Sequence, residues 1–336
     1  MSTSGTMRAV ASYQGLPVDD QDSVVDVEVS VPELRGRDVL VRVQAVSVNP
    51  VDVKIRSGLA ASKTPRILGF DAAGVVEAVG PDVTTLAVGD EVWYAGDVTR
   101  PGANADLHAV DERLVGRKPN SLTFAEAAAM PLTTITAWET LFERFGLTQD
   151  SKGTLVVLAG AGGVGSMTVQ LAKALTGVRV LASATRSESR AWVQELGADA
   201  VVDHHDLVES ATNAAPDGID YLLSPHSRGN IETYAQIMRP FGHITAIDEP
   251  EGLDLLPLKS KSVAWHWELM FTRSIHQTDD MVVQKNLLET VAGLVDEKRI
   301  RTTLTTAIDD FSAAGLREAH RLVETGRVTG KIVVTR

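Results

Sequence analysis

Residues 154–186 read TLVVLAGAGGVGSMTVQLAKALTGVRVLASATR, and this stretch decides the fold expected for the chain. The run from Thr154 to Ala159 is apolar on both faces, which is typical of a parallel strand that is covered on both sides. A glycine turn follows, and then come the pattern of an amphipathic helix and a second short strand. This order of strand, helix and strand predicts the first part of a doubly wound parallel sheet.

The glycine turn fits the G-x-G-x-x-G pattern of a dinucleotide site. Gly160 permits the tight turn, Gly162 lets a pyrophosphate approach the backbone, and Gly165 lets the helix pack closely on the strand. The helix N-terminus would direct its N–H groups at the phosphates. A glycine-rich turn that binds nothing is the alternative. The loop residues expected to contact the cofactor are Gly160, Ala161, Gly162, Gly163, Val164 and Gly165.

Composition and charge exclude several classes of function. The chain has 336 residues, enough for about two domains, and a net charge of −12, which speaks against nucleic acid or an anionic membrane as a partner. It has no cysteine, which excludes disulfides, thiolate-bound zinc and a thiol nucleophile. The first ten residues, MSTSGTMRAV, lack the apolar core of a secretory signal, and no stretch reaches the roughly 18 apolar residues of a membrane span. We therefore expect a cytoplasmic protein.

The segments on either side of the glycine turn differ in pattern. Hydrophobic residues alternate over 24–31 and 39–48, and turn residues punctuate the chain up to about residue 122, so this part predicts an irregular β-barrel or sandwich. Thr123 and Glu126 predict a helix that begins with a capping box. From residue 154 onward β and α patterns alternate, with strands expected at 154–159, 178–183, 199–203, 219–224 and 243–248.

The last part of the chain predicts two further features. Residues 279–297 have a helical pattern, and we expect this helix beside the parallel sheet. Residues 331–334 form a closing strand, which we expect to return to the N-terminal domain.

Together these motifs resemble the medium-chain dehydrogenase/reductase superfamily, most closely its quinone oxidoreductases and zinc-type alcohol dehydrogenase-like proteins. The resemblance implies an α/β fold that combines a GroES-like β-barrel domain, residues 1–125 with 300–336, and a Rossmann domain for NADP(H), residues 126–299. It also implies a substrate cleft between the domains and a homodimer through the Rossmann edge. The stretches that carry it are AVSVNPVD at 45–52, GFDAAGVV at 69–76, VGDEV at 88–92, PLTTITAW at 131–138, AGAGGVG at 159–165 and GKIV at 330–333.

The chain departs from zinc-dependent members of that superfamily at the metal ligands. Those members have cysteine where this chain reads NPVD at 49–52, and His-Glu where Phe70 and Asp71 stand. The cysteine-rich zinc lobe is also missing. His204 and His205 are adjacent and would point to opposite faces of a strand. We therefore predict no catalytic zinc, no structural zinc and no metal ligand.

The end of the second strand bears on the choice of cofactor. A site for NAD places an acidic residue there to hold the ribose hydroxyls. Here the segment 183–186 reads SATR, so Ser183 and Thr185 can donate to a 2′-phosphate and Arg186 can pair with it. We expect NADP(H) as the cofactor. The alternatives are a surface charge at Arg186 and a capping box between Thr185 and Glu188.

Further cofactor contacts follow from the resemblance. It implies His204 near the adenosine phosphate, Lys331 in the cofactor cleft, and Thr133 and Thr134 beside the nicotinamide. The alternatives are a loop histidine, a surface lysine on an edge strand and threonines that cap a helix. The resemblance also implies that the loops after Ser224 and Ile247 frame the nicotinamide.

The expected chemistry is hydride transfer without a metal. A quinone or an α,β-unsaturated carbonyl suits such a site because the developing charge delocalises over a conjugated system. Asn49 would donate to the substrate oxygen, while Asp52 and Lys54 would orient Asn49 or supply a proton through water. The alternatives are a turn-forming Asp52 and a Lys54 that pairs with it on the surface. The cluster Trp265-His266-Trp267 would line a substrate pocket or pack in the core.

The leading hypothesis is thus a zinc-independent, NADPH-dependent quinone or enone oxidoreductase that acts on a small carbonyl or quinone substrate. An alcohol or aldehyde oxidoreductase of the zinc-type family is one alternative. A non-catalytic NADPH-binding protein is the other.

Overall fold

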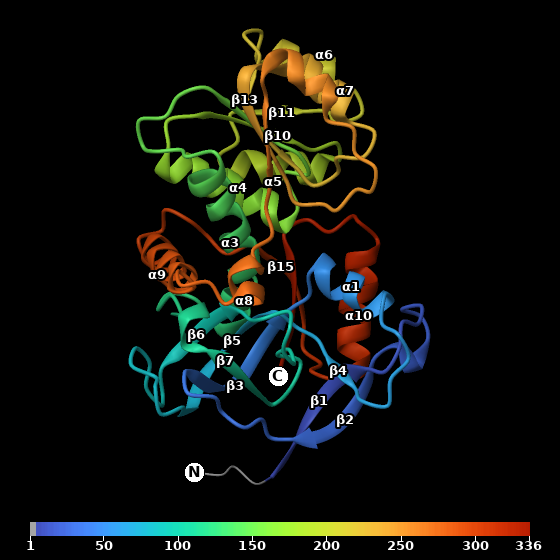
Figure 1. Cartoon of the computed structure of the whole chain (residues 1–336), viewed down its shortest axis with the longest axis vertical. Coiled ribbons are helices and arrows are strands. Elements are labelled where there is room, and N and C mark those ends of the chain that lie inside the picture. Colours follow the sequence, from blue (N-terminus) through green and yellow to red (C-terminus); the bar gives the residue numbers. More distant parts are fainter. Residues whose placement is uncertain (1–4) are drawn as a thin grey trace. The chain divides into compact units, whose positions relative to one another are not determined.

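The computed structural model describes residues 5–336, which fold into two compact units (Figure 1). Unit 1 consists of the chain up to Leu132 together with Phe271–Arg336, and unit 2 is the continuous segment Thr133–Met270. The expected domain limits were 1–125 with 300–336, and 126–299. The compact units differ from them because residues 126–132 and 271–299 belong to unit 1.

Unit 2 is built on a parallel sheet of six strands in the order β11-β10-β9-β12-β13-β14. From β9 the chain adds strands first on one side, β10 and β11, and then on the other, β12 to β14. This is the doubly wound arrangement, in which ligands bind where the two halves of the sheet meet, here between β9 and β12. The expected Rossmann sheet is confirmed. Its strands are β9 Thr154–Val157, β10 Arg179–Ser183, β11 Ala200–Val202, β12 Ile219–Ser224, β13 Met238–Ala246 and β14 Ala264–Trp267.

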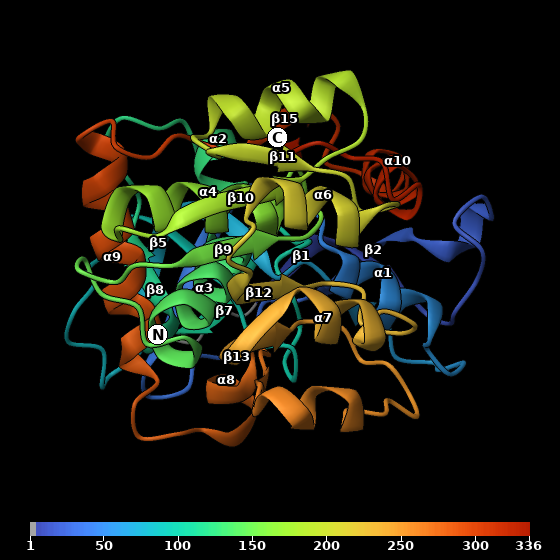
Figure 2. The same ribbon diagram turned by 90° about the horizontal axis from the view of Figure 1, so that it is seen from above.

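Helices cover both faces of this sheet, with α4 on one side and α6 and α7 on the other (Figure 2). The strands are apolar on both faces because both faces are buried: the successive residues Leu155, Val156 and Val157 of β9, which alternate between the faces, have no exposed surface. The helix α3 continues directly as a π-helix from Glu139. The helical segments are α3 Pro131–Trp138, η3 Glu139–Arg144, α4 Gly163–Leu175, α5 Ser187–Glu195, α6 Leu207–Ala214, α7 Ile231–Ile237 and η4 Leu256–Lys261.

Unit 1 contains a seven-stranded sheet in the order β15-β16-β3-β5-β6-β8, with β7 paired to β3, and a three-stranded sheet β2-β1-β4. The β-rich architecture expected before residue 123 is confirmed. The strands are β1 Thr6–Ser12, β2 Val25–Ser30, β3 Asp38–Ser47, β4 Arg66–Ile67, β5 Asp71–Val79, β6 Glu91–Ala95, β7 Leu107–Asp111, β8 Val115–Arg117, β15 Leu304–Ile308 and β16 Lys331–Thr335.

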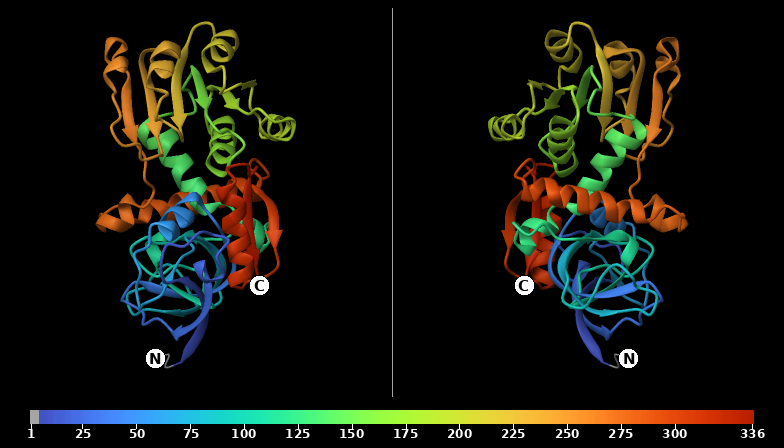
Figure 3. Two further views of the ribbon diagram at one scale, coloured as in Figure 1. Left: turned by 90° about the vertical axis from the view of Figure 1, so that its right-hand side faces the viewer. Right: turned by 90° about the vertical axis from the view of Figure 1, so that its left-hand side faces the viewer.

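Strand β16 runs antiparallel to β3, with Val333 opposite Ser47, and parallel to β15. The expected return of this late strand to the N-terminal domain is therefore confirmed. Helix α10 lies beside β16 (Figure 3) and buries Leu316 and Ala319. The helices of unit 1 are η1 Gln21–Ser23, α1 Pro50–Ser57, η2 Glu112–Leu114, α2 Phe124–Ala128, α8 Thr272–His276, α9 Val282–Asp296 and α10 Ala313–Glu324.

Two local expectations for these helices have different outcomes. The capping box of α2 is confirmed, since Thr123 Oγ1 accepts from the N–H of Glu126 at 3.2 Å and the Glu126 carboxylate accepts from the N–H of Thr123 at 2.9 Å. The expectation that residues 279–297 lie beside the parallel sheet is wrong, because α9 packs on β8 of unit 1. A Cβ at Gly116 would lie 2.9 Å from the Cβ of Leu288, so this glycine permits the close approach.

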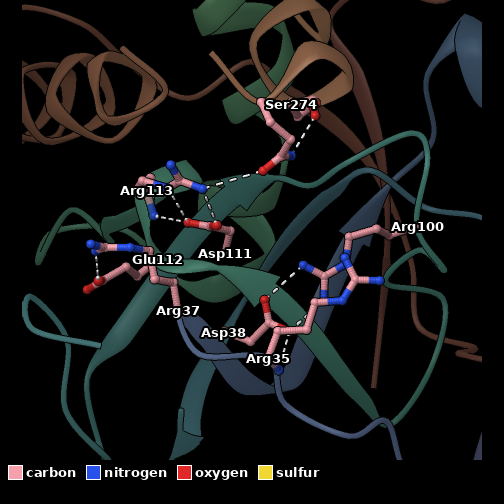
Figure 4. A network of polar contacts seen from close by, with 9 residues as sticks. Arg35, Arg37, Asp38, Arg100, Asp111, Glu112, Arg113 and Ser274 are labelled. Carbon is pink, nitrogen blue, oxygen red and sulfur yellow. Dashed lines mark hydrogen bonds and ion pairs between the residues drawn. The ribbon is translucent and has the colours of Figure 1, made fainter. Parts of the chain in front are cut away.

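Ion pairs fix the loops around the start of β3 and η2 (Figure 4). Arg100 donates two hydrogen bonds to the Asp38 carboxylate, at 2.8 and 2.7 Å. Glu112 pairs with Arg37 at 3.2 Å and also accepts from the N–H of Thr85. These buried or half-buried acids all have partners within unit 1, so their role is to hold its loops. Among residues 5–336, no helix is both long and apolar enough to cross a membrane.

Candidate functional site

The glycine loop of unit 2 follows directly after β9. Ala159 adopts a left-handed conformation with φ of 49°, and its N–H donates to Ser183 Oγ at 2.8 Å. The N–H of Gly160 donates to the Ser183 carbonyl at 3.0 Å. The turn is therefore anchored on the last residue of β10. This explains why the strand expected to reach residue 159 ends at Val157.

The three motif positions need glycine for two different physical reasons. A Cβ at Gly160 would lie 2.8 Å from the Cβ of Ala182, and a Cβ at Gly165 would lie 2.5 Å from the carbonyl oxygen of Ala159. Both glycines are thus required by packing. A Cβ at Gly162 would meet only the Ala159 carbonyl, at 3.3 Å. The Gly162 side of the loop is therefore uncovered, and a ligand's phosphate can approach the backbone there.

The start of α4 is suited to an anion. Gly162 is its N-cap, no side chain caps the helix, and its first turn holds no acidic residue. The first N–H groups of a helix have no partner within the helix, and the helix dipole places positive charge there. An uncapped N-terminus beside an open glycine backbone fits the pyrophosphate of a dinucleotide.

The segment after β10 carries the residues expected to read the ribose phosphate. Ser183 is buried, whereas Thr185 and Arg186 are exposed. The capping box considered for Thr185 and Glu188 is wrong, because α5 has Arg186 as its N-cap. Ser183 Oγ accepts from Ala159 and keeps its own hydrogen to donate. No carboxylate stands in the segment 183–186, which suits a cofactor with a 2′-phosphate.

The structure corrects the expected orientation of the adjacent histidines. Strand β11 ends at Val202, so His204 and His205 lie in the loop after it and are not on a strand. Their ring centroids are 4.2 Å apart, and their nitrogens and an oxygen of Asp203 lie within 4.8 Å of one another. Burial and the neighbouring His205 lower the pKa of His204. The argument that the two rings point apart is therefore wrong.

The two threonines expected beside the nicotinamide are buried within α3, where Thr133 is 2% and Thr134 0% exposed. The helix begins at Pro131, so neither residue is its N-cap and the capping alternative is wrong. Thr134 Oγ1 has no hydrogen-bond partner among the described residues. A buried hydroxyl without a partner is costly unless a ligand or water satisfies it.

The loops after β12 and β13 are tied together where these strands end. The N–H of Ile247 donates to the Ser224 carbonyl at 3.0 Å. Ser224 Oγ contacts Ser227 Oγ at 3.0 Å and the hydroxyl of Tyr234 at 2.8 Å. Sequence reasoning missed Ser227 and Tyr234. No local pattern identified them, because Tyr234 reaches this edge of the sheet from the following helix, α7.

Unit 1 brings together Asn49, Asp71 and Lys331 in a buried polar cluster. The Lys331 ammonium donates to Asn49 Oδ1 and lies 3.0 Å from Asp71 Oδ2. Asn49 Nδ2 donates to the same Asp71 oxygen at 2.8 Å. Asp71 was not among the expected site residues. Lys331 is 4% exposed on a strand flanked by β15 and β3, so the alternative of a surface lysine on an edge strand is wrong.

Asp52 supports this cluster from the first turn of α1. One of its carboxylate oxygens accepts from the N–H of Asn49 at 2.8 Å and the other from the N–H of Gly69 at 2.9 Å. Burial raises the pKa of Asp52 to about 7, although both of these hydrogen bonds lower it. Lys54 is on the exposed side of α1, whereas Asp52 is only 1% exposed. The alternative that the two residues pair on the surface is therefore wrong, because Asp52 is buried.

The donors of this cluster do not fit a zinc ion. Phe70 is fully buried and packs edge-on against Phe271, with ring centroids 5.4 Å apart, so it offers no ligand. The oxygens of Asn49 and Asp71 already face the Lys331 ammonium. A divalent cation would have to displace this fixed positive charge, and neutral imidazole or thiolate ligands are absent from the cluster.

The cluster Trp265-His266-Trp267 forms β14 at the edge of the parallel sheet. Trp265 packs against the core of unit 2, and Trp267 is 54% exposed. His266 Nε2 contacts His243 Nδ1 at 3.1 Å. Trp265 thus matches the core-packing alternative and Trp267 does not. The expectation that this cluster lines a substrate pocket stays a prediction.

Glu268, directly after β14, is a buried acid that sequence reasoning missed. It pairs with Arg144 at 2.9 Å. Burial and the neighbouring Glu139 carboxyl raise the pKa of Glu268 well above its ordinary value. No local pattern in the sequence shows that Glu139 and Glu268 meet.

Two family models match the chain. An alcohol dehydrogenase GroES-like domain matches residues 35–138, and a zinc-binding dehydrogenase domain matches residues 196–334. A zinc-type alcohol dehydrogenase-like protein of Staphylococcus epidermidis is 36% identical over 335 residues, which are 98% of this chain and 99% of that protein. An NADPH-dependent alkenal/one oxidoreductase of Arabidopsis thaliana is 35% identical over 248 residues, 70% of this chain and 61% of that protein.

A solved structure is also similar over the whole chain. It is a Rhizobium etli CFN 42 protein whose name assigns it provisionally to the zinc-dependent alcohol dehydrogenases. The TM-score is 0.94 at 44% sequence identity, and the match covers 99% of this chain and 98% of that one.

Proposed function

Since the chain belongs to the medium-chain dehydrogenase/reductase superfamily, we propose that it is a zinc-independent oxidoreductase that transfers a hydride from NADPH to a quinone or an α,β-unsaturated carbonyl. The observation that carries the proposal is the anion site of unit 2. There an open Gly162 backbone and the uncapped start of α4 adjoin a segment, Ser183–Arg186, that contains a cation and no carboxylate. The Arabidopsis relative, named for NADPH and for alkenals, supports this choice of cofactor and substrate class.

The residues of unit 2 would hold the cofactor along the edge of the parallel sheet. The glycine loop binds the pyrophosphate, and Ser183, Thr185 and Arg186 bind the 2′-phosphate. His204 is proposed as a further contact near the adenosine phosphate. The unsatisfied hydroxyl of Thr134 is available to the nicotinamide end, together with Thr133 and the loops after Ser224 and Ile247. When bound, NADPH supplies the hydride.

The residues of unit 1 would act on the substrate. Asn49 lies in a buried cluster that contains the positive charge of Lys331. Asp52 holds the backbone of Asn49 and of Gly69, so we propose it as a positioning residue. Lys54, exposed on α1, would pass a proton from water. No step requires a metal, because conjugation spreads the negative charge that develops on the substrate.

A spectrophotometric screen of cofactor oxidation tests the proposal. Purified protein is mixed with NADPH or NADH and a panel of quinones, enones, saturated aldehydes and ketones, with and without a chelator. We expect turnover with NADPH on quinones or enones that the chelator does not reduce. Activity confined to simple alcohols or aldehydes and lost on chelation would instead favour a zinc-type alcohol dehydrogenase. NADPH binding without turnover on any substrate would favour a non-catalytic protein.

We also infer a homodimer that forms through β14. This strand is at the edge of the six-stranded sheet and so has one unpaired side, and Trp267 and Leu269 beside it are 54% and 45% exposed. An exposed edge strand with apolar side chains is suited to pairing with a second copy. Light scattering during gel filtration tests this. A monomer at micromolar concentration would contradict the inference.

A further inference from the structure

We propose that Lys331 is a catalytic residue of this protein: its buried ammonium group donates a hydrogen bond to the oxygen of the quinone or carbonyl substrate as negative charge develops there. This inference rests on the proposed function, and it gives Lys331 a role in the substrate site in place of the cofactor contact expected from sequence.

The hydrogen bonds of the ammonium leave one donor available. An ammonium group has three N–H donors. One points to Asn49 Oδ1 and one to Asp71 Oδ2, at 3.0 Å. The third has no acceptor among residues 5–336. Because the group is only 4% exposed, an additional acceptor supplied by a ligand would bind it in a poorly solvated environment.

The position of Lys331 is fixed by the fold. The backbone N–H of Lys331 donates to the Thr303 carbonyl at 2.8 Å, and its strand, β16, lies between β15 and β3. Its partner Asp71 is held from the other side, since the N–H of Leu132 donates to Asp71 Oδ1 at 2.7 Å. Such preorganised donors stabilise developing charge without the cost of reorganising during the reaction.

One group of the cluster, the Lys331 ammonium, has the charge that an oxyanion needs. Lys331 is the cluster's only cation among the described residues, and Asp71 is its direct counterion. In the reduction of an enone, the hydride brings two electrons to the β-carbon, and the π pair of the C=C bond moves toward the oxygen. The oxidised cofactor and an enolate result, and one proton from water completes the saturated ketone. Lys331 stabilises the enolate oxygen, which is the role a metal ion has in other carbonyl reductions.

The test compares Lys331→Met with wild type on the best substrate from the screen. We expect kcat to fall about 100-fold, the size of effect seen when a donor to an oxyanion is removed. The dissociation constant for NADPH, measured separately by fluorescence titration, should change less than about twofold. Lys285→Met is the matched control, because Lys285 is also a buried, ion-paired lysine of unit 1, and should keep its kcat.

Chemical rescue keeps the test decisive if the methionine variant is unstable. Lys331→Ala should recover kcat at least about tenfold in ethylammonium chloride. It should not recover in tetramethylammonium chloride of the same ionic strength, because that cation has no N–H donor.

Two results would overturn the proposal. One is an unchanged kcat in Lys331→Met. The other is a large rise in the NADPH dissociation constant with kcat retained at saturation, which would make Lys331 a cofactor contact. If the wild-type protein does not oxidise NADPH with any quinone or enone of the panel, the proposed function itself fails. An active wild type with an equally active Lys331→Met variant contradicts only the role of Lys331.

Discussion

The hydroxyl of Ser183 connects the fold to the proposed ligand. It accepts from the N–H of Ala159 and thereby holds the glycine turn, yet a hydroxyl can donate at the same time. The residue type at this position therefore affects the shape of the loop and, under the proposed function, would also affect the choice of cofactor. Arg186, three residues later and exposed, is the only basic residue of the segment 183–186 and carries most of the expected selectivity.

Replacement of Arg186 by alanine should reduce the preference for NADPH. A hydrogen bond to a charged group contributes about 1.5–3 kcal/mol, so kcat/KM with NADPH should fall roughly 10- to 100-fold. The value with NADH should stay nearly constant. Steady-state kinetics with both cofactors measure this. Arg190→Ala is the control, since Arg190 lies on α5, the helix that Arg186 precedes, and bonds to the Ala184 carbonyl. An equal loss in both variants would contradict a specific role for Arg186.

His108 should make unit 1 sensitive to acid. Its ring is 4% exposed and bonds to the Tyr94 hydroxyl and the Pro101 carbonyl, both at 3.0 Å. Burial and the nearby Arg100 lower the pKa of His108 to about 4 from 6.5. The folded state therefore binds the proton more weakly than the unfolded state. The stability that neutral His108 contributes is present above pH 6.5 and is lost as the pH falls toward 4.

Urea unfolding at pH 7 and pH 4.5 measures this contribution. The pKa difference corresponds to about 2 kcal/mol lost between these two pH values. His108→Gln should be less stable than wild type at pH 7 and lose about 2 kcal/mol less on acidification. The exposed His276, replaced in the same way, should show the full loss of wild type. Identical acid losses in all three proteins would exclude His108 as the cause.

At the scale of an element, the turn between β9 and α4 contains one glycine that packing requires and another that is proposed to admit the cofactor. Gly165 is closed in by backbone atoms and Gly162 is open on its ligand side. Two residues of one motif thus have different physical reasons to be glycine. The same residue type meets two demands that substitutions can distinguish.

Gly165→Ala should mainly destabilise the protein, and Gly162→Ala should mainly weaken cofactor binding. The first variant forces a methyl group against the Ala159 carbonyl, a form of overpacking that costs about 1–3 kcal/mol. The second should raise the NADPH dissociation constant at least about tenfold with a smaller change in Tm, because the methyl group covers the path of the pyrophosphate. Differential scanning fluorimetry and NADPH titration compare them. Equal effects of both variants would refute the distinction.

The sequence predicted some elements closely because their signals are local. The capping box of α2, the closing strand β16 and the glycine loop depend on residues close together in the chain, and all three are found. The helix at 279–297 was assigned to the wrong partner, since a helical pattern shows an apolar face and does not show which sheet will cover it. The predicted orientation of His204 and His205 was wrong because β11 ends at Val202, so neither histidine lies on the strand.

The candidate site was predicted in part for the same reason. Asn49 and Lys331 were expected, yet their contact joins residues that are 282 positions apart, and Asp71 was missed. Glu139 and Glu268 were missed as well, because a pattern within a few residues cannot show that two distant acids meet. Local motifs predict the proposed anion site, whereas the polar cluster of unit 1 is apparent only from the tertiary fold.

At the scale of the whole molecule, unit 2 is one uninterrupted segment and unit 1 is made of two. A continuous segment with its own core can fold when it is separated from the rest of the chain. We expect the fragment 133–270 to be soluble, to unfold cooperatively and to bind NADPH, as circular dichroism and fluorescence titration would show. The fragment 5–132 should not fold by itself, since β3 would lack its neighbour β16. A disordered fragment 133–270 would contradict this independence.

The place of β16 between β15 and β3 has a consequence for the order of assembly during synthesis. Ribosomes make β3 almost 300 residues before Lys331, and the whole of unit 2 is made in between. Unit 2 can therefore acquire its structure while the sheet of unit 1 still waits for a missing strand. The Lys331 ammonium that pairs with Asp71 belongs to β16. Asp71 therefore lacks its counterion in a nascent chain until β16 has been made and has joined the sheet. Chains that stall before residue 331 should accordingly be recognised by chaperones or proteases through unit 1.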